Sequence, residues 1–200
     1  MWKSGLIGAL SALLAMAFPT GAVADPMQDA KTACNEGDYA SALGLYRPLA
    51  ERGAADAQYG LGAMFYRGQG VARDFGEALH WFRLAAEQGH ADACNSLGVM
   101  YYEGSGTPKN AGEAFKWFRL AAEQGRAAAQ YMVGIMYFNG TGTSQDFVNA
   151  YKWVTLAASG YATKEQKDNA VRAGRSIAKG MTSDQINEAR RLALQWKPAK

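Results

Sequence analysis

Two histidines and two cysteines are the side chains in this chain best suited to metal binding or nucleophilic chemistry: His80, His90, Cys34 and Cys94. Zinc sites usually have about two to five residues between the two members of a ligand pair. The histidines lack that close spacing, no cysteine or carboxylate cluster surrounds them, and the cysteines form no Cys-x-x-Cys pattern. We find no Ser/His/Asp or Cys/His arrangement either. The sequence therefore predicts no metal, no cofactor and no catalytic residue.

Three glycine-rich segments look like phosphate-binding loops: Gly68-x-Gly70, Gly104-x-Gly106 and Gly140-x-Gly142. A dinucleotide-binding loop follows a strand and has a third glycine at a fixed spacing. These segments follow helical patterns and occur three times, so we interpret them as helix caps, where glycine accepts a positive φ.

A period of 36 residues organises most of the chain. Trp81, Trp117 and Trp153 are spaced by this interval, and each precedes a similar ending that runs from leucine to glycine. A fixed period of this size is typical of a stacked repeat array, which presents an extended surface. Within each unit, apolar spacings of three and four residues predict two helices. The recurring Gly62, Gly98 and Gly134 are interpreted as points of close approach between helices.

The repeats and the non-repeating sequences at the two ends divide the chain into six segments. Their helical patterns predict ten helices in five hairpins, with no strands. The third unit is expected to end at Gly160, and the segment after it reads as two capping helices with a basic outer face. The segments are 1–24 (signal peptide), 25–53 (degenerate first repeat), 54–89, 90–125 and 126–160 (full repeats) and 161–200 (C-terminal cap).

The N-terminus has the features of a secretory signal. Lys3 precedes an apolar run from Leu6 to Phe18, and Ala22-Val23-Ala24 matches a signal peptidase site. We expect cleavage before Asp25 and a periplasmic or secreted product without a membrane segment. The alternative is an uncleaved anchor, but the run is short for a span of roughly 20 residues.

Charge and cysteine placement limit the classes of partner. The formal net charge of +3 is too small to indicate nucleic acid binding. Residues 161–200 are basic, with 9 Lys or Arg against 4 Asp or Glu, which fits an acidic partner, a membrane surface or a solvated helical face. Cys34 and Cys94 fall in different hairpins, and packed helices lie roughly 8–10 Å apart. Since a disulfide needs Cα atoms within about 7 Å, both are expected to be free, buried or half-buried thiols.

The repeated residues resemble the Sel1-like repeat. In the second unit the pattern runs from Ala91-Asp92-Ala93 through Leu97-Gly98, Met100-Tyr101 and Gly104-Ser105-Gly106 to Trp117 and Gly125. The resemblance implies an all-α fold, an α/α solenoid with a tetratricopeptide-like superhelix, that acts as a protein-interaction scaffold. For an exported member it implies an adaptor or regulator in the cell envelope, without catalysis. A cysteine-rich branch of the family is linked to penicillin-like compounds and cell-wall fragments, but its paired cysteines are missing here.

Comparison of the units with one another indicates a binding stripe on the first helices, which line the concave surface in related solenoids. Positions that differ between units recur at helical spacing, whereas core positions repeat. The apolar residues of the third unit fit either a partner or packing against the C-terminal helices. The candidate partner-binding residues are Asp56, Arg67, Ser96, Val99, Glu103, Met132, Ile135, Phe138 and Asn139.

The sequence thus predicts a monomer that binds another protein, in the envelope, through this stripe. The competing hypothesis is a protein that binds or hydrolyses cell-wall fragments or β-lactams.

Overall fold

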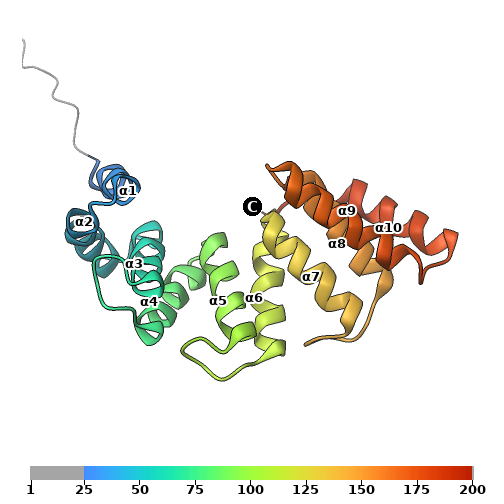
Figure 1. The fold of residues 1–200 in the computed structure, drawn as a ribbon, viewed down its shortest axis with the longest axis horizontal. Coiled ribbons are helices and arrows are strands. Elements are labelled where there is room, and N and C mark those ends of the chain that lie inside the picture. The colour runs from blue at the N-terminus through green and yellow to red at the C-terminus, as the bar shows by residue number, and fades with distance from the viewer. Residues whose placement is uncertain (1–24, 200) are drawn as a thin grey trace, which may run out of the picture.

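The computed structural model describes residues 25–199, which form ten α-helices and no strand. The helices follow one another around an arc that is open on one side (Figure 1). The predicted all-α solenoid is confirmed. The signal peptide assigned to residues 1–24 lies outside the described residues. The helices are α1 (Pro26–Glu36), α2 (Tyr39–Glu51), α3 (Ala55–Arg67), α4 (Phe75–Glu87), α5 (Ala91–Glu103), α6 (Ala111–Glu123), α7 (Ala127–Asn139), α8 (Phe147–Gly160), α9 (Lys164–Ala178) and α10 (Ser183–Gln195).

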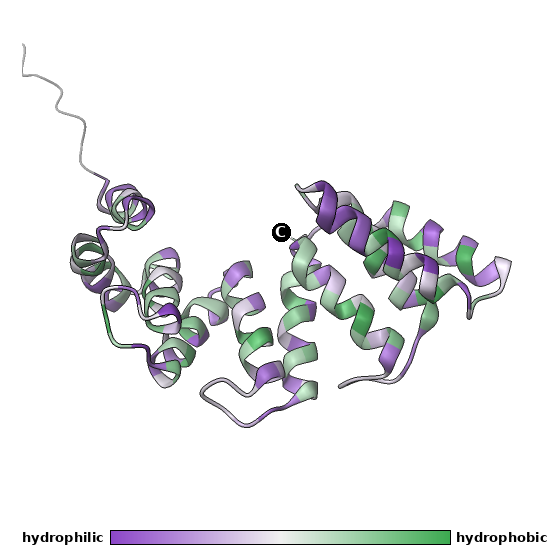
Figure 2. Ribbon diagram, viewed as in Figure 1, coloured by the Kyte–Doolittle hydropathy of each residue, from purple (hydrophilic) through white to green (hydrophobic). Residues whose placement is uncertain are grey.

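Close contacts between the two helices of a hairpin rest on the glycines that recur inside the first helices. A methyl group added at Gly98 in α5 would lie 2.6 Å from the buried ring of Phe118 in α6. Gly62 meets Phe82 in the same way, and Gly134 meets Val154. Apolar residues elsewhere on these helices pack into a core cluster shared by neighbouring helices. Figure 2 shows hydrophobic positions alternating with hydrophilic ones along the helices. The close approach predicted at these glycines is therefore confirmed.

The two glycines of each Gly-x-Gly loop have different structural roles. Gly104 ends α5 in the left-handed conformation with φ 81°, as predicted for a cap. Gly106 also has a positive φ, but it lies against the backbone at Phe75, the first residue of the preceding hairpin's second helix. Helix capping alone therefore explains only half of the motif, because the second glycine allows one repeat to pack on the previous one.

A buried polar side chain links each of the three full repeats to the hairpin before it. Gln58 Nε2 donates a hydrogen bond of 3.2 Å to the carbonyl oxygen of Ala50, and Gln130 does the same to Ala122. Cys94 occupies the matching position in the second repeat, where its Sγ lies 3.9 Å from the carbonyl oxygen of Ala86. Cys94 is thus a buried residue in an inter-repeat contact, and Cys34 is half-buried in α1; both are free thiols.

Polar side chains cap the starts of several helices. Before α4, the Asp74 side chain accepts hydrogen bonds from the backbone N–H groups of Gly76 and Glu77. The Glu77 carboxylate does not return to the cap and instead accepts from Trp81 Nε1 at 3.1 Å. The reciprocal capping box forms at Thr182 and Gln185. The hydrogen bond from Trp81, four residues along the helix, thus takes the place of the bond by which Glu77 would complete a capping box.

The third repeat ends at Gly160, but this glycine differs in conformation from those that end the other two full repeats. Gly89 and Gly125 adopt positive φ after their helices, but Gly160 stays within α8, which runs on to an extended residue at Tyr161. The third repeat lacks the residue that would place its glycine beyond the helix end. The chain therefore enters the C-terminal cap without the left-handed turn that separates the other repeats.

The C-terminal helices close the array. α9 packs on α8 around Val154, Ala170 and Ile177, and α10 returns to the other side of α8. Trp196 packs edge-to-face on Trp153 at 6.2 Å. The basic side chains predicted for the outer face are exposed: Lys164, Lys167, Arg175, Lys179, Arg190 and Arg191. Among the residues described, no helix is long and apolar enough to cross a bilayer.

Candidate functional site

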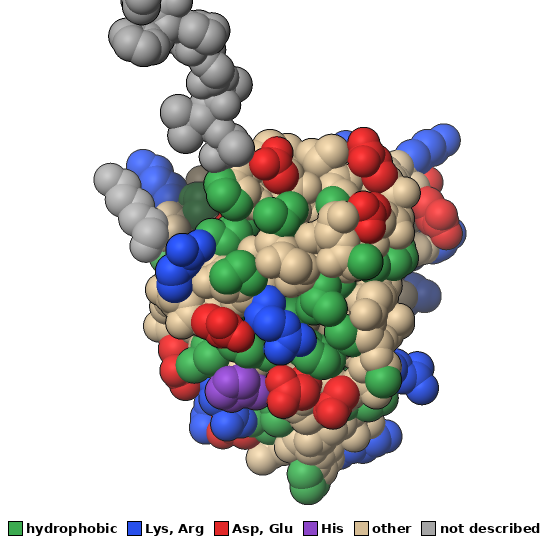
Figure 3. Space-filling model, turned by 90° about the vertical axis from the view of Figure 1, so that its left-hand side faces the viewer, with side chains coloured by type: hydrophobic (Ala, Val, Ile, Leu, Met, Phe, Trp, Pro, Cys, Tyr) green, Lys and Arg blue, Asp and Glu red, His purple; other side chains and the backbone are tan. Residues whose placement is uncertain are grey.

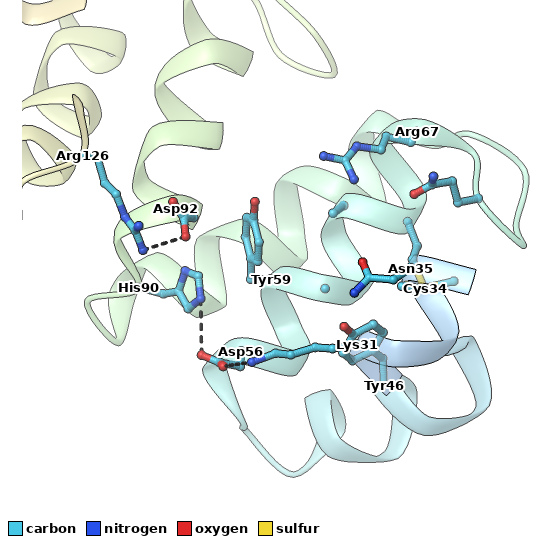
Figure 4. Close-up of a pocket in the computed structure, with 14 residues that line it drawn as sticks. Lys31, Cys34, Asn35, Tyr46, Asp56, Tyr59, Arg67, His90, Asp92 and Arg126 are labelled. Carbon is cyan, nitrogen blue, oxygen red and sulfur yellow. Dashed lines mark hydrogen bonds and ion pairs between the residues drawn. The ribbon is translucent and has the colours of Figure 1, made fainter. Parts of the chain in front are cut away.

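A cavity of about 420 Å³ is lined by residues of α1, α3 and the start of α5 (Figure 4). Lys31, Cys34 and Asn35 come from α1, and α3 contributes Asp56, Tyr59, Ala63 and Arg67. His90 and Arg126, the residues just before α5 and α7, complete one wall with Asp92. We call this cavity and the smaller one beside it the first-helix groove, since the first helices of successive hairpins form most of it.

A repeated ionic contact connects neighbouring repeats along the groove. The residue before α5 and the residue before α7 each reach the aspartate near the start of the previous first helix. His90 Nε2 lies 3.4 Å from Asp56 Oδ1, and Arg126 Nη2 lies 2.8 Å from Asp92 Oδ2. Lys31 of α1 adds a 2.7 Å contact to Asp56. The Lys31 hydrogen bond, with His90 nearby, holds the pKa of the Asp56 carboxyl below its usual value.

His90 has a structural position rather than the surroundings of a metal ligand. Its Nδ1 accepts from the backbone N–H of Ala93 at 3.2 Å and so caps α5. The imidazole stacks on the Tyr59 ring, with centroids 4.7 Å apart and an interplanar angle of 21°. Both ring nitrogens therefore have protein partners. Across residues 25–199 no group of three or more His, Cys, Asp or Glu side chains could hold a metal ion.

Two of the groups that line the cavity, the Cys34 thiol and the Tyr46 hydroxyl, have raised pKa values. Burial raises the pKa of the Cys34 thiol above its ordinary value. Burial and the nearby Cys34 raise the pKa of Tyr46 to about 12. Thiolate is the reactive form of cysteine, so these surroundings oppose nucleophilic chemistry at Cys34 and leave this part of the lining neutral and polar.

Arg67 joins this cavity to a second one of about 150 Å³. Tyr59, Ala63 and Arg67 line both. The second cavity is bordered by Tyr66, Phe82 and Val99, with Asn95 and Ser96 at its edge. A polar cavity and a largely apolar one therefore lie side by side. The face seen from the side of α1 and α2 carries basic, acidic and apolar side chains interspersed (Figure 3).

The structure gathers part of the predicted stripe around the groove. Asp56 and Arg67 line the larger cavity, and Arg67, Ser96 and Val99 line the smaller. Glu103 lies one helical turn beyond Val99, where its carboxylate accepts from the Tyr66 hydroxyl at 3.4 Å.

The part of the stripe on α7 has different surroundings. Met132 packs against the central core cluster, and Ile135 and Phe138 pack against the C-terminal cluster of α8 and α9. Asn139 is exposed and lines neither groove cavity. The sequence left two alternatives for the apolar residues of this repeat, contact with a partner or packing against the C-terminal helices. Ile135 and Phe138 pack against the C-terminal helices.

Sequence comparison missed several residues of the groove, namely Lys31, Asn35, Gln69, His90 and Arg126. Lys31 and Asn35 lie in the degenerate first repeat, whose positions were not aligned with those of the three full repeats. His90 and Arg126 occupy the same repeat position as Ala54. That position also varies between units, so extending the comparison one residue before each first helix would have found it.

Comparison with known proteins identifies the repeat. A sequence model described as "Sel1 repeat" matches residues 55–90, 91–125 and 127–160. The chain belongs to the Sel1 repeat family. Members of this family are generally non-catalytic scaffolds for protein–protein interaction.

Two solved structures have the same fold as this Sel1 repeat protein. A Sel1 repeat protein from Oxalobacter formigenes is 26% identical with a TM-score of 0.66, over 84% of this chain and 74% of that one. The protein c5321, a protective antigen present in uropathogenic Escherichia coli strains that displays an SLR fold, is 28% identical with a TM-score of 0.57. That alignment covers 78% of this chain and 40% of c5321. No curated protein matches the sequence.

Proposed function

We propose that this Sel1 repeat protein is an exported, monomeric adaptor that binds another protein of the cell envelope through the first-helix groove, without catalysis. The proposal rests on the location of the residues that differ between the repeats. Positions that repeat, such as Leu61 and Leu97, are buried in the core, whereas Arg67, Ser96 and Val99 differ from their counterparts in the other repeats and border the two cavities.

The physical properties of the groove support a protein partner. It follows several helices and contains charged, polar and aromatic groups together, a composition common at non-obligate protein interfaces. The signal-like sequence at the N-terminus supports export to the envelope. An adaptor needs no reactive side chain. In agreement, both ring nitrogens of His90 contact other residues of the protein, and the pKa of the Cys34 thiol is raised.

Site-specific photo-crosslinking in the native cells tests this proposal. A benzoylphenylalanine residue replaces Ser96 in the groove or, as a control, the exposed Ala40 of α2. We expect a discrete crosslinked partner from position 96 and none from position 40. Equal crosslinking from both positions, or none from position 96, would contradict binding through the groove.

The size of the larger cavity favours a second candidate function. A volume of about 420 Å³ is within the range of about 300–1,000 Å³ that small-molecule sites occupy. Cell-wall fragments or β-lactams would raise the melting temperature if they bind the native state. A shift with such compounds that is lost when Asp56 and Arg67 are replaced would favour this function over the adaptor.

A further inference from the structure

We infer that the first-helix groove recognises a partner segment in which a carboxylate lies beside an aliphatic side chain, with Arg67 binding the carboxylate. This inference rests on the proposed function and deepens it. It assigns a chemical class to the segment that occupies the groove.

The first step is the charge balance of the larger cavity. Its walls carry three cations and two carboxylates: Lys31, Arg67, Arg126, Asp56 and Asp92. Asp56 is held by Lys31 at 2.7 Å, and Asp92 by Arg126 at 2.8 Å. The side chain of the third cation, Arg67, forms no ion pair and no hydrogen bond with the rest of residues 25–199.

The second step is distance along the helix. Asp56 and Arg67 lie near opposite ends of α3, and a rise of 1.5 Å per residue separates them by about 16 Å along the axis. Asp92 lies near the start of α5, close to the Asp56 end of the groove. Figure 4 shows Arg67 well apart from the Lys31–Asp56 and Arg126–Asp92 pairs. The two aspartates therefore cannot neutralise Arg67.

The third step concerns Glu103, the acidic residue at the matching position of α5. Its carboxylate accepts from the Tyr66 hydroxyl at 3.4 Å and from Ser105 Oγ at 3.5 Å. It forms no ion pair with the Arg67 guanidinium. The groove thus presents a guanidinium whose N–H donors match a carboxylate in a two-point arrangement, with Asn35 and Gln69 lining the same cavity.

The fourth step is the neighbouring apolar cavity. It shares Tyr59, Ala63 and Arg67 with the larger one, and Tyr66, Phe82 and Val99 form its apolar walls. Its volume of about 150 Å³ leaves room for one aliphatic side chain. Arg67 lines this cavity too, and residues of an extended peptide rise only about 3.3 Å each, so the carboxylate and the aliphatic side chain should lie within two residues of each other.

The shared chemistry is a carboxylate, which an Asp or Glu side chain or a free C-terminus can provide. Selection from a displayed library of random twelve-residue peptides tests the inference on the whole purified protein. We expect enriched peptides to carry an acidic group within two residues of Leu, Ile, Val or Met. Selection on Arg67→Ala should lose the acidic preference, and selection on Arg47→Ala, which removes an exposed arginine of α2, should keep it.

Affinities of an enriched peptide then measure the contact itself. Arg67→Ala and a Glu→Gln change in the peptide should each weaken binding about tenfold, and together they should cost little more than either alone. Peptides with amidated and free C-termini distinguish a side-chain carboxylate from a terminal one. Circular dichroism and melting temperature check that both arginine variants fold.

Three outcomes would overturn the inference: no peptide enriched, enriched peptides without an acidic group, or equal losses in the Arg67 and Arg47 variants. Photo-crosslinking separates these from failure of the proposed function. A partner captured from position 96 whose bound segment lacks the acidic–aliphatic pair would overturn the inference alone. Capture of no partner would contradict the adaptor itself.

Discussion

The carboxylate of Asp56 lies 2.7 Å from the ammonium group of Lys31, and this contact ties α1 to α3 at one end of the groove. The same carboxylate faces His90 before α5, so three hairpins meet at one side chain. The degenerate first repeat is therefore held in place partly by an ion pair as well as by apolar packing around Tyr46 and Leu61.

Asp56→Asn should destabilise the protein at neutral pH and much less in acid. The pKa of Asp56 is lowered in the folded state, so its stabilisation is complete above the unfolded pKa of about 3.9 and is lost as pH falls through the folded pKa. The carboxylate is half exposed, which limits the effect to below about 1 kcal/mol. Urea unfolding at pH 7 and pH 3 measures it. An equal difference at both pH values would contradict the ion-pair origin.

Cys94→Gln should stabilise the protein by about 1 kcal/mol. Glutamine at the matching positions 58 and 130 donates to a carbonyl of the preceding hairpin, whereas the Cys94 thiol contacts Ala86 only weakly at 3.9 Å. A rise of about 2–4 °C in melting temperature is expected for a chain of this size. Gln130→Leu is the reciprocal control and should lower it. A lower melting temperature for Cys94→Gln would show that the second repeat lacks room for the amide.

Alanine at two helical glycines should have opposite effects. At Gly98 the new methyl group would meet the buried Phe118 ring at 2.6 Å, so Gly98→Ala should destabilise by about 1–3 kcal/mol. At Gly44 in α2 nothing lies within 4 Å of the methyl position, and higher helix propensity should stabilise by up to about 1 kcal/mol. Chemical unfolding measures both. Stabilisation by both variants would contradict the close approach of α5 and α6.

Lys116→Ala should stabilise the protein by about 1 kcal/mol by freeing Glu113. The Trp81 indole donates to Glu77 four residues earlier, whereas the buried Trp117 indole N–H has no partner and Glu113, at the matching position, pairs with Lys116 at 2.6 Å. The Trp117 indole N–H signal in an NMR spectrum should shift when Glu113 becomes available. An unchanged signal and unchanged stability would show that Glu113 does not reach it.

The sequence was sufficient to predict the helices, their order and the division into hairpins, because stacking imposes the same residues at every period. The groove was only partly predictable. Arg67 and Val99 were found because they vary between repeats, but the contribution of Lys31 depends on how a degenerate hairpin docks. Two features near the C-terminal end of the array could not be predicted from the repeat pattern either: Gly160 stays helical, and Ile135 packs under the C-terminal cap. Those details depend on contacts between units that differ in sequence.

The affinity of the crosslinked partner for an Ala63→Trp variant tests binding through the groove most directly. Ala63 lines both cavities, so an indole there should block them whatever chemistry the partner uses. Ala40→Trp places the same group on the exposed surface of α2 as a control. Isothermal titration should show at least about a tenfold loss, roughly 1.4 kcal/mol, for Ala63→Trp and an unchanged affinity for Ala40→Trp. Wild-type affinity in a correctly folded Ala63→Trp protein would contradict the account.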